Sequence, residues 1–463
     1  MDSNKDFLGT EPVGKLLFKL SVPTVVAQLI NMLYNIVDRI YIGHMPGDGT
    51  LALTGVGVCM PIIMLVSAFA ALVGSGGAPR ASIAMGQKNP SFAEKTMANC
   101  FTLQLVISAV LTVVLLFWSR PILMTFGATE ETIGYAVAYL QIYAIGTVFV
   151  QLTLGMNAFV TAQGFTKTSM LSVVIGAVTN IILDPIFIFG LHMGVRGAAL
   201  ATVLSQALSC TWVLVFLFGR KTVLKLRVKY MGLKARIVMP CVALGMAAFI
   251  MQGSESVISV CFNTSLRHYG GNTAVGAMTI LTSVMMFAML PLMGLAQGAQ
   301  PITSYNYGAG NSQRVRKSFW LLTWSGFAYS ALLWAAIMLF PGGFARIFSP
   351  DPVLIEFTAK ALRVYAAGIL IFGIQMGCQM TFTSLGYAKQ AISAAVVRKF
   401  VLLLPLIYIV PHLVSNPTMG VYMAEPIADF LAVIYTASIF AFSFKKAMAK
   451  LENQQTDKAD LLR

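Results

Sequence analysis

Charged side chains are scarce in this sequence. Of its 463 residues only 11% are Asp, Glu, Lys or Arg, whereas soluble domains carry about 25%. Hydrophobic residues make up 57% of the chain, and the mean hydropathy is +0.78. The shortage of charge excludes a soluble enzyme of two or three domains, and the abundance of Leu, Ile, Val and Phe excludes a disordered or fibrous chain. A polytopic helical membrane protein remains.

Cysteine, histidine and the common catalytic motifs are also poorly represented. The six cysteines lie inside apolar stretches without a C-x-x-C pair, and the four histidines are scattered. We therefore expect neither a disulfide framework nor a metal cluster, and no cofactor. No H-E-x-x-H, G-x-S-x-G or Walker A pattern is present, so the sequence indicates neither an enzyme nor an ATP-driven pump.

Long apolar runs bounded by Gly, Pro and charged residues predict an all-α membrane protein with twelve transmembrane helices. The predicted limits of these spans are 16–42, 51–78, 97–118, 132–155, 166–190, 195–218, 237–265, 273–299, 317–340, 353–382, 388–411 and 419–444. Spans 1–6 form an N-lobe at 1–218, and spans 7–12 form a C-lobe at 237–444. A cytoplasmic linker at 219–236 joins the lobes, and a cytoplasmic tail follows at 445–463. We expect two pseudo-symmetric bundles of six helices each.

Basic residues are unevenly distributed between the predicted loops. Most lie in the termini and the even-numbered loops, above all in the linker 219–236, and the odd-numbered loops hold only Arg120, Arg196, Arg267 and Arg346. By the positive-inside rule, both termini are predicted to be cytoplasmic, in agreement with an even number of spans. Topology thus accounts for the net charge of +15, and no nucleic-acid partner is expected.

The chain repeats itself. A shift of 222 residues aligns, among others, Gly86 with Gly308, Asn89 with Asn311, Gly164 with Gly386 and Lys167 with Lys389. In the first span the shift is 217, and we expect a longer loop around 267–272 to absorb the difference. Six spans per repeat is an even number, so both halves insert the same way, as parallel repeats do.

Ionisable side chains inside the predicted spans are functional candidates, because placing a charge in a bilayer is costly. In the N-lobe these are Asp38 in span 1 and Asp184 in span 5. At a rise of about 1.5 Å per residue, both lie in the outer half of the lobe, near the depth of Thr202 in span 6. Asn180 lies one turn before Asp184, on the same helix face. Two carboxylates, an amide and a hydroxyl at one depth predict a site for a proton or for Na⁺.

Each of the two N-lobe acids also has a purely structural interpretation. Asp38 precedes Arg39 and could be a helix-end residue in contact with outside water, while Asp184 precedes Pro185 and could mark a bend. Adjacent residues do not share a helix face, so Asp38 can point inward while Arg39 reaches the surface. We therefore favour the functional interpretation for both acids.

The C-lobe carries a different set of charges, with Glu255 in span 7, Arg398 in span 11, and Glu425 and Asp429 in span 12. The repeat aligns Glu255 with Asp38, so a carboxylate is retained there. Glu425 and Asp429 share one helix face, so one of them is expected to be protonated or paired with Arg398. This charged network either locks the C-lobe structurally or takes part in ion coupling, and the sequence leaves both open.

Several ordered segments carry a resemblance to a known family. They are PTVVAQLINMLYNIVDRIYIG at 23–43, GQKN at 86–89, TAQGFTK at 161–167, NIILDP at 180–185, GVRGAALATVLSQ at 194–206, GAGN at 308–311 and AEPIAD at 424–429. In this order the chain resembles the multidrug and toxic compound extrusion (MATE) family along essentially its whole length. The last segment, together with Arg398, looks like the efflux subgroup of Gram-positive bacteria.

The resemblance implies a V-shaped pair of six-helix lobes that exports cationic, amphiphilic drugs in exchange for H⁺ or Na⁺. In such relatives the N-lobe ion site uses acids in spans 1 and 5, an Asn one turn before the second acid, and a Thr in span 6. The four N-lobe residues named above match this pattern, and Glu255 matches an acid that many members carry in span 7. The sequence departs from Na⁺-type members with an Asp in span 10, because 363–380 contains no acid.

A secondary active antiporter is therefore predicted, which exports cationic amphiphilic drugs or toxic organic compounds by alternating access. The alternative is a lipid-linked oligosaccharide flippase of the same superfamily, although such proteins often have basic residues in the cavity and additional spans. We expect a monomer in the bacterial cell (inner) membrane that contacts lipid and acts on small molecules. The sequence does not identify the residues that contact substrate.

Overall fold

The computed structural model describes residues 6–45 and 49–460, and throughout these ranges the regular elements are helices. The α-helices are α1 (Phe7–Thr10), α2 (Val13–Gly43), α3 (Gly49–Gly86), α4 (Pro90–Phe117), α5 (Ser119–Thr125), α6 (Ile133–Ala162), α7 (Thr166–Pro185), α8 (Val195–Phe218), α9 (Ala235–Gly308), α10 (Ser312–Leu339), α11 (Pro341–Phe348), α12 (Pro352–Tyr365), α13 (Ile369–Ser384), α14 (Ala388–Val396), α15 (Leu404–Ile409) and α16 (Pro417–Asp460). Two π-helical segments, Ile186–Gly190 and Val397–Leu403, follow α7 and α14.

Eleven helical stretches of the described residues are long and apolar enough to cross a membrane. One of them, α9, has 74 residues and is broken at Gly271, whose φ of 62° and ψ of −157° are accessible essentially only to glycine. It therefore supplies two spans, and the chain is a multi-pass membrane protein with the twelve predicted helices. The prediction of a longer loop around 267–272 was wrong, because the chain is helical on both sides of the single non-helical residue Gly271.

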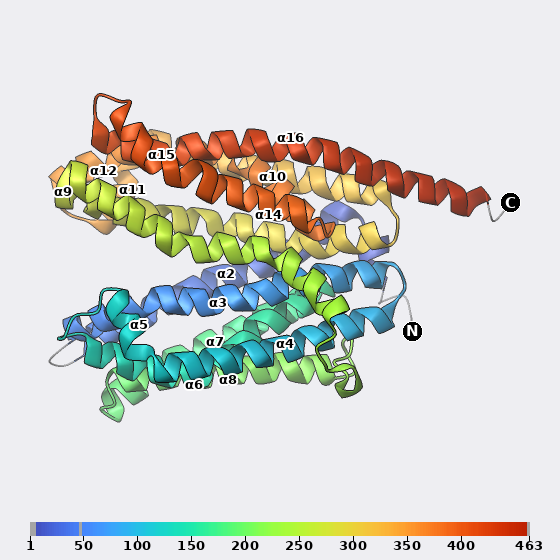
Figure 1. Ribbon diagram of the computed structural model, residues 1–463, viewed down its shortest axis with the longest axis horizontal. Coiled ribbons are helices and arrows are strands. Elements are labelled where there is room, and N and C mark those ends of the chain that lie inside the picture. The colour runs from blue at the N-terminus through green and yellow to red at the C-terminus, as the bar shows by residue number, and fades with distance from the viewer. Residues whose placement is uncertain (1–5, 46–48, 461–463) are drawn as a thin grey trace.

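The helices form two bundles that lie side by side (Figure 1). We call α2–α8 the N-lobe and α9–α16 the C-lobe. The predicted limits of the lobes in the sequence stay a prediction. Residues 1–5 and 461–463, at the two ends of the chain, lie outside the described part. Span 12 continues beyond its predicted end at 444, since α16 runs to Asp460 without a break. Ala447, Met448 and Leu451 are buried there against the C-lobe, so the first part of the predicted tail packs on the protein.

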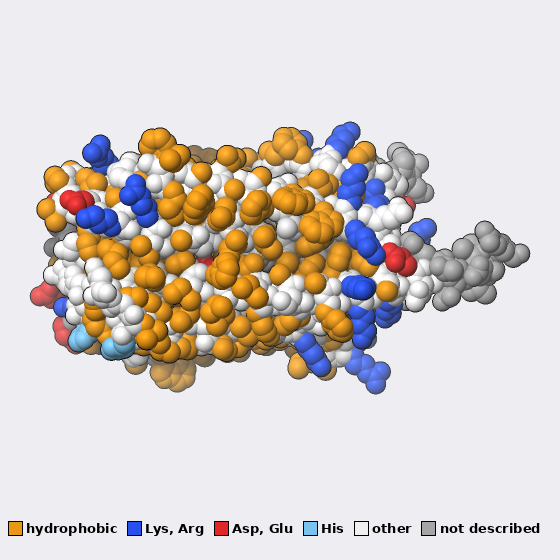
Figure 2. Space-filling view, turned by 90° about the horizontal axis from the view of Figure 1, so that it is seen from above, with side chains coloured by type: hydrophobic (Ala, Val, Ile, Leu, Met, Phe, Trp, Pro, Cys, Tyr) orange, Lys and Arg blue, Asp and Glu red, His pale blue; other side chains and the backbone are white. Residues whose placement is uncertain are grey.

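One end of the molecule is strongly basic. Both described termini lie at this end (Figure 1), and Figure 2 shows Lys and Arg side chains gathered there, with hydrophobic side chains across the middle. Exposed residues of the linker, including Arg220, Lys221, Lys229 and Lys234, contribute to the charge. We call this the basic end and the opposite one the far end.

The linker is docked on the N-lobe. The side-chain oxygen of Gln163 accepts hydrogen bonds from the Thr222 hydroxyl at 2.8 Å and from the backbone N–H groups of Val223 and Leu224 at 2.9 and 2.7 Å. The buried Glu94 carboxylate binds Arg227 at 2.7 Å. These bonds fix the first half of the linker to the N-lobe, before α9 of the C-lobe begins.

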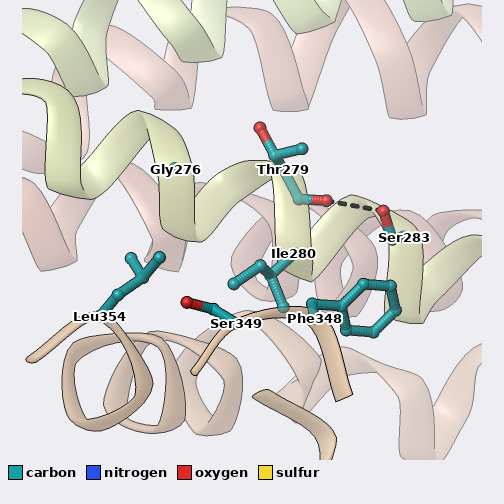
Figure 3. A pocket seen from close by; sticks show the side chains of 7 residues that line it. All are labelled: Gly276, Thr279, Ile280, Ser283, Phe348, Ser349 and Leu354. Carbon is teal, nitrogen blue, oxygen red and sulfur yellow. Dashed lines mark hydrogen bonds between the residues drawn. The ribbon is translucent and has the colours of Figure 1, made fainter. Parts of the chain in front are cut away.

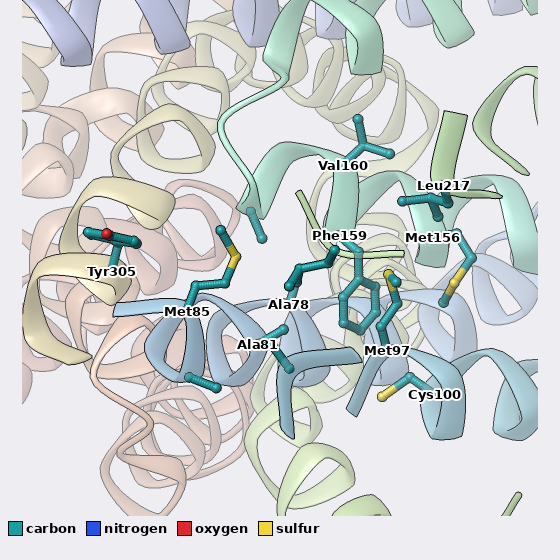
Figure 4. Packing of buried hydrophobic residues seen from close by; sticks show 14 of the residues in the cluster. Ala78, Ala81, Met85, Met97, Cys100, Met156, Phe159, Val160, Leu217 and Tyr305 are labelled. Carbon is teal, nitrogen blue, oxygen red and sulfur yellow. The ribbon is translucent and has the colours of Figure 1, made fainter. Parts of the chain in front are cut away.

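The apolar cores show where the lobes touch. At the basic end a single cluster combines Leu16 and Phe159 of the N-lobe with Ile302 and Tyr305 of the C-lobe, and Figure 4 shows part of it. The clusters toward the far end belong to one lobe each, as the N-lobe cluster around Leu140 illustrates. The lobes are thus joined at the basic end and separately packed at the far end, which is the V shape that the resemblance implies.

Glycines bring the two lobes into backbone contact at the basic end. A Cβ atom built on Gly86 lies 2.0 Å from the carbonyl oxygen of Tyr305, and one built on Gly308 lies 2.0 Å from that of Ile83. The 222-residue shift relates the two contacts, because 86 + 222 = 308 and 83 + 222 = 305. Each repeat thus supplies the glycine on which the other repeat packs, and we call this pair of contacts the glycine seam.

Replacing Gly86 by Ala is expected to lower the stability of the closed basic end by about 1–3 kcal/mol, because the added methyl group overlaps a backbone oxygen. The matched control is Gly57→Ala in the same helix α3, where a Cβ meets nothing within 4 Å. Thermal unfolding in detergent is the measurement. Equal melting temperatures for the two variants would contradict the role of the glycine seam.

Candidate functional site

The structure brings the four predicted N-lobe residues together. Asp38 comes from α2, Asn180 and Asp184 from the last turns of α7, and Thr202 from α8; α2 and α8 both pack against α7. Asp38 is 6% exposed and Asp184 is 0% exposed, and they lie close enough for their carboxyl groups to share a hydrogen bond. Arg39, next to Asp38, is exposed at the surface.

Three oxygen atoms of this group lack a hydrogen-bond donor. They are Oδ1 of Asp38, Oδ1 of Asn180 and Oδ2 of Asp184. The Asn180 amide donates to Oδ1 of Asp184 at 3.3 Å, and the Thr202 hydroxyl donates to the Ala198 carbonyl at 3.0 Å, which leaves its own oxygen free to accept. Among the described residues no Lys, Arg or His forms an ion pair with either acid. A proton or a small cation would supply what the buried oxygens lack.

A small cavity adjoins these side chains. It has a volume of about 40 Å³ and lies between α2, α6, α7 and α8. Asn180 and Thr202 line it together with Tyr34, Ser205 and Gln206, whose buried Oε1 atom has no hydrogen-bond partner. The group of four predicted residues and the cavity thus share Asn180 and Thr202.

The site also contains two tyrosines that were not predicted from the sequence. The buried Tyr139 of α6 lies within hydrogen-bonding distance of Thr202, and Tyr34 lies one turn before Asp38 on α2 and lines the cavity. The i, i+4 spacing of Tyr34 and Asp38 is a signal that could have found the first. No such signal exists for Tyr139, because α6 contacts α8 only in the fold.

The C-lobe charges form a compensated network. Arg398 donates from Nε to Asp429 at 2.7 Å and from Nη2 to Glu425 at 3.4 Å, and its guanidinium lies over the Phe372 ring at 4.9 Å. Glu255 does not bind Arg398 and instead accepts a hydrogen bond from Lys399 at 2.6 Å. Each acid of the C-lobe group therefore has a basic partner, unlike the acids of the N-lobe.

Lys399 is a buried charge that the sequence analysis did not select. Its side chain is 4% exposed, whereas that of Glu255 is 54% exposed. Both Arg398 and Lys399 are buried because they lie in the π-helical segment Val397–Leu403, which departs from α-helical spacing. The only signal in the sequence was a second basic residue next to the first.

A larger hollow lies elsewhere in the C-lobe. It has a volume of about 360 Å³ and opens between α9, α11 and α12, where Figure 3 shows Thr279, Ser283 and Phe348 among its lining residues. The Ser283 hydroxyl donates to the Thr279 carbonyl at 2.8 Å. The described residues that line this hollow are uncharged.

A model of the MatE family matches residues 23–186 and 247–409. The chain belongs to the MatE family. The two matched segments lie one in each half of the chain, so the family pattern occurs twice, in agreement with the internal repeat.

Two curated relatives are export proteins of staphylococci. The multidrug export protein MepA of Staphylococcus haemolyticus is 26% identical over 431 residues, which cover 92% of this chain and 94% of the relative. MepA of Staphylococcus aureus NCTC 8325 is 23% identical over 435 residues, or 94% of each chain. These relatives confirm the predicted family.

Solved structures share the MatE fold. A crystal structure of MATE in the bent conformation superposes with a TM-score of 0.91 at 22% identity, covering 98% of this chain and all of the other. An outward-facing MATE family transporter of the MOP superfamily superposes with a TM-score of 0.90 at 23% identity, covering 96% and 99%. The predicted fold class is therefore confirmed.

Proposed function

We propose that this protein is a secondary active multidrug antiporter that exports cationic amphiphilic compounds in exchange for H⁺ or Na⁺. The observation that carries the proposal is the buried pair Asp38 and Asp184, which has unpaired oxygens and no basic partner. Membership of the MatE family and similarity to relatives named as multidrug export proteins support it.

Competition for one charge accounts for the exchange. A cation bound at Asp38 and Asp184 removes the negative charge that would attract a cationic compound toward the N-lobe. Because the two cations exclude each other, entry of one drives release of the other.

Alternating access then delivers the two cations to opposite sides of the membrane. The basic end is the cytoplasmic end by the positive-inside rule, so both described termini are cytoplasmic. With the lobes joined at this end, the far end faces the outside and the coupling ion enters there. Parting of the lobes at the basic end admits the compound from the cytoplasm.

The C-lobe network is assigned a structural role in this proposal. Its three acids are matched by Arg398 and Lys399, so no uncompensated pair is available there for a coupling ion. The buried N-lobe acids also favour a cation over the anionic lipid carrier of an oligosaccharide flippase, since like charges repel.

Purified protein in liposomes tests the proposal. Ethidium, a fluorescent cation, is loaded on the side of the basic end, and a pH gradient and a Na⁺ gradient are imposed separately. We expect ethidium to move against its own concentration gradient when either the pH gradient or the Na⁺ gradient, whichever couples transport, is imposed. Movement under neither gradient, by protein whose melting curve shows that it is folded, would overturn the proposal.

A further inference from the structure

The N-terminal residues 6–11 connect the two lobes at the basic end. They precede α2 and are therefore attached to the N-lobe, and they contain the short helix α1, which packs on α9 of the C-lobe. Leu8 is completely buried in the cluster shared by both lobes. The ring of Phe7 lies 2.4 Å from a Cβ built on Gly164, in the turn between α6 and α7.

Three C-lobe side chains bind this segment by hydrogen bonds. The Tyr305 hydroxyl, whose ring Figure 4 shows, donates to Asp6 at 2.8 Å, and the Asn306 amide donates to the Leu8 carbonyl at 3.0 Å. Arg314 donates from Nη2 to the carbonyl oxygens of Leu8 at 3.1 Å and Glu11 at 2.6 Å.

Arg314 is held in place for this contact. Its Nε donates to Oδ1 of the buried Asn306 at 2.9 Å, and α10 begins just before it, at the N-cap Asn311. Both N-lobe carbonyl oxygens that it binds belong to backbone at the ends of α1, where carbonyl groups have no partner inside the helix. A charged donor thus binds the Glu11 carbonyl and adds a second hydrogen bond to the Leu8 carbonyl in the joint between the lobes.

We propose that residues 6–11 are a latch that holds the lobes together at the cytoplasmic end and sets how readily they part there. Arg314 is its principal positioning residue, with Asn306 and Tyr305 supporting it. The inference rests on the proposed alternating access, because parting of the lobes must break these bonds while the contact of Phe7 with Gly164 of the same lobe persists.

Distance measurement between the lobes tests the latch. Spin labels are attached at two exposed positions, Gln87→Cys after α3 and Gln313→Cys in α10. Pulsed electron paramagnetic resonance then measures the distance between the two labels over a pH series and resolves short from long distances. In Arg314→Gln the ratio of long to short distances is expected to rise about tenfold, as for loss of hydrogen bonds from a charged donor. Tyr305→Phe, which keeps the ring and loses one bond, is expected to produce a smaller rise.

The matched control is Arg316→Gln on the same helix. Arg316 is about half exposed and pairs with Glu452 at 2.8 Å, so this variant removes the same charge without touching residues 6–11. We expect it to leave the distance ratio unchanged. An equal rise in Arg316→Gln, or an unchanged ratio in both Arg314→Gln and Tyr305→Phe, would overturn the latch. The ethidium experiment decides the proposed function independently, because it uses the unmodified protein.

Discussion

Asp38→Asn is expected to reduce gradient-driven export of ethidium to the level of empty liposomes. The amide has nearly the same size as the carboxyl group, so the buried position in α2 remains filled. It carries no charge and neither binds nor releases a proton, so the paired site with Asp184 loses the property on which exchange depends. Asp184→Asn is expected to have the same effect, because the site depends on both carboxyl groups and this variant leaves only one.

A surface variant provides the control for this loss. Glu130→Gln makes the same chemical change in a side chain that is 75% exposed and pairs with Arg120 at the protein surface. Such exposed ion pairs contribute little, and transport is expected to stay at the native rate. Native export by Asp38→Asn, at equal amounts of protein in the liposomes, would show that the N-lobe acids do not couple transport.

Arg398→Met is expected to destabilise the protein by about 3–5 kcal/mol, because it leaves the carboxylates of Asp429 and Glu425 buried without their guanidinium partner. A thiol-reactive dye measures the unfolding temperature conveniently, since five of the six cysteines are buried and become reactive only on unfolding.

A combined variant separates lost charge balance from lost packing. Arg398→Met together with Asp429→Met and Glu425→Gln removes the uncompensated charges and is expected to recover much of the stability. Arg120→Met, which breaks an exposed pair, is expected to change it by less than about 1 kcal/mol. A single variant Arg398→Met as stable as the native protein would contradict the structural role of the network.

Four residues of the N-lobe site could be predicted from the sequence because local patterns indicate them. Asp38 and Asp184 are acids in apolar spans, and the spacing of Asn180 and Asp184 places them on one helix face. Depth along each helix then brings Thr202 to the same level. These rules use only distances along a helix, which the chain specifies directly.

Other features depend on geometry that helical spacing does not describe. The burial of Lys399 arises from a π-helical segment, while the rule for α-helices turns adjacent residues to different faces. A loop was expected between the two spans of α9, but a single residue, Gly271, makes the break. The residues on both sides of it remain helical. The binding of residues 6–11 by Arg314 joins positions some three hundred residues apart, which no local pattern reveals.

The glycine seam has a consequence for the origin of the chain. Gly86 and Gly308 occupy equivalent positions, and each receives the backbone of the other half at the same 2.0 Å spacing. A half-length ancestor that inserted two copies in the same direction would make both contacts with a single glycine, about a two-fold axis. The joint between the lobes thus has the two-fold symmetric form of a homodimer interface within a single chain. Because its two glycines are separate positions of one chain, unlike those of a true homodimer, either can be substituted without altering the other.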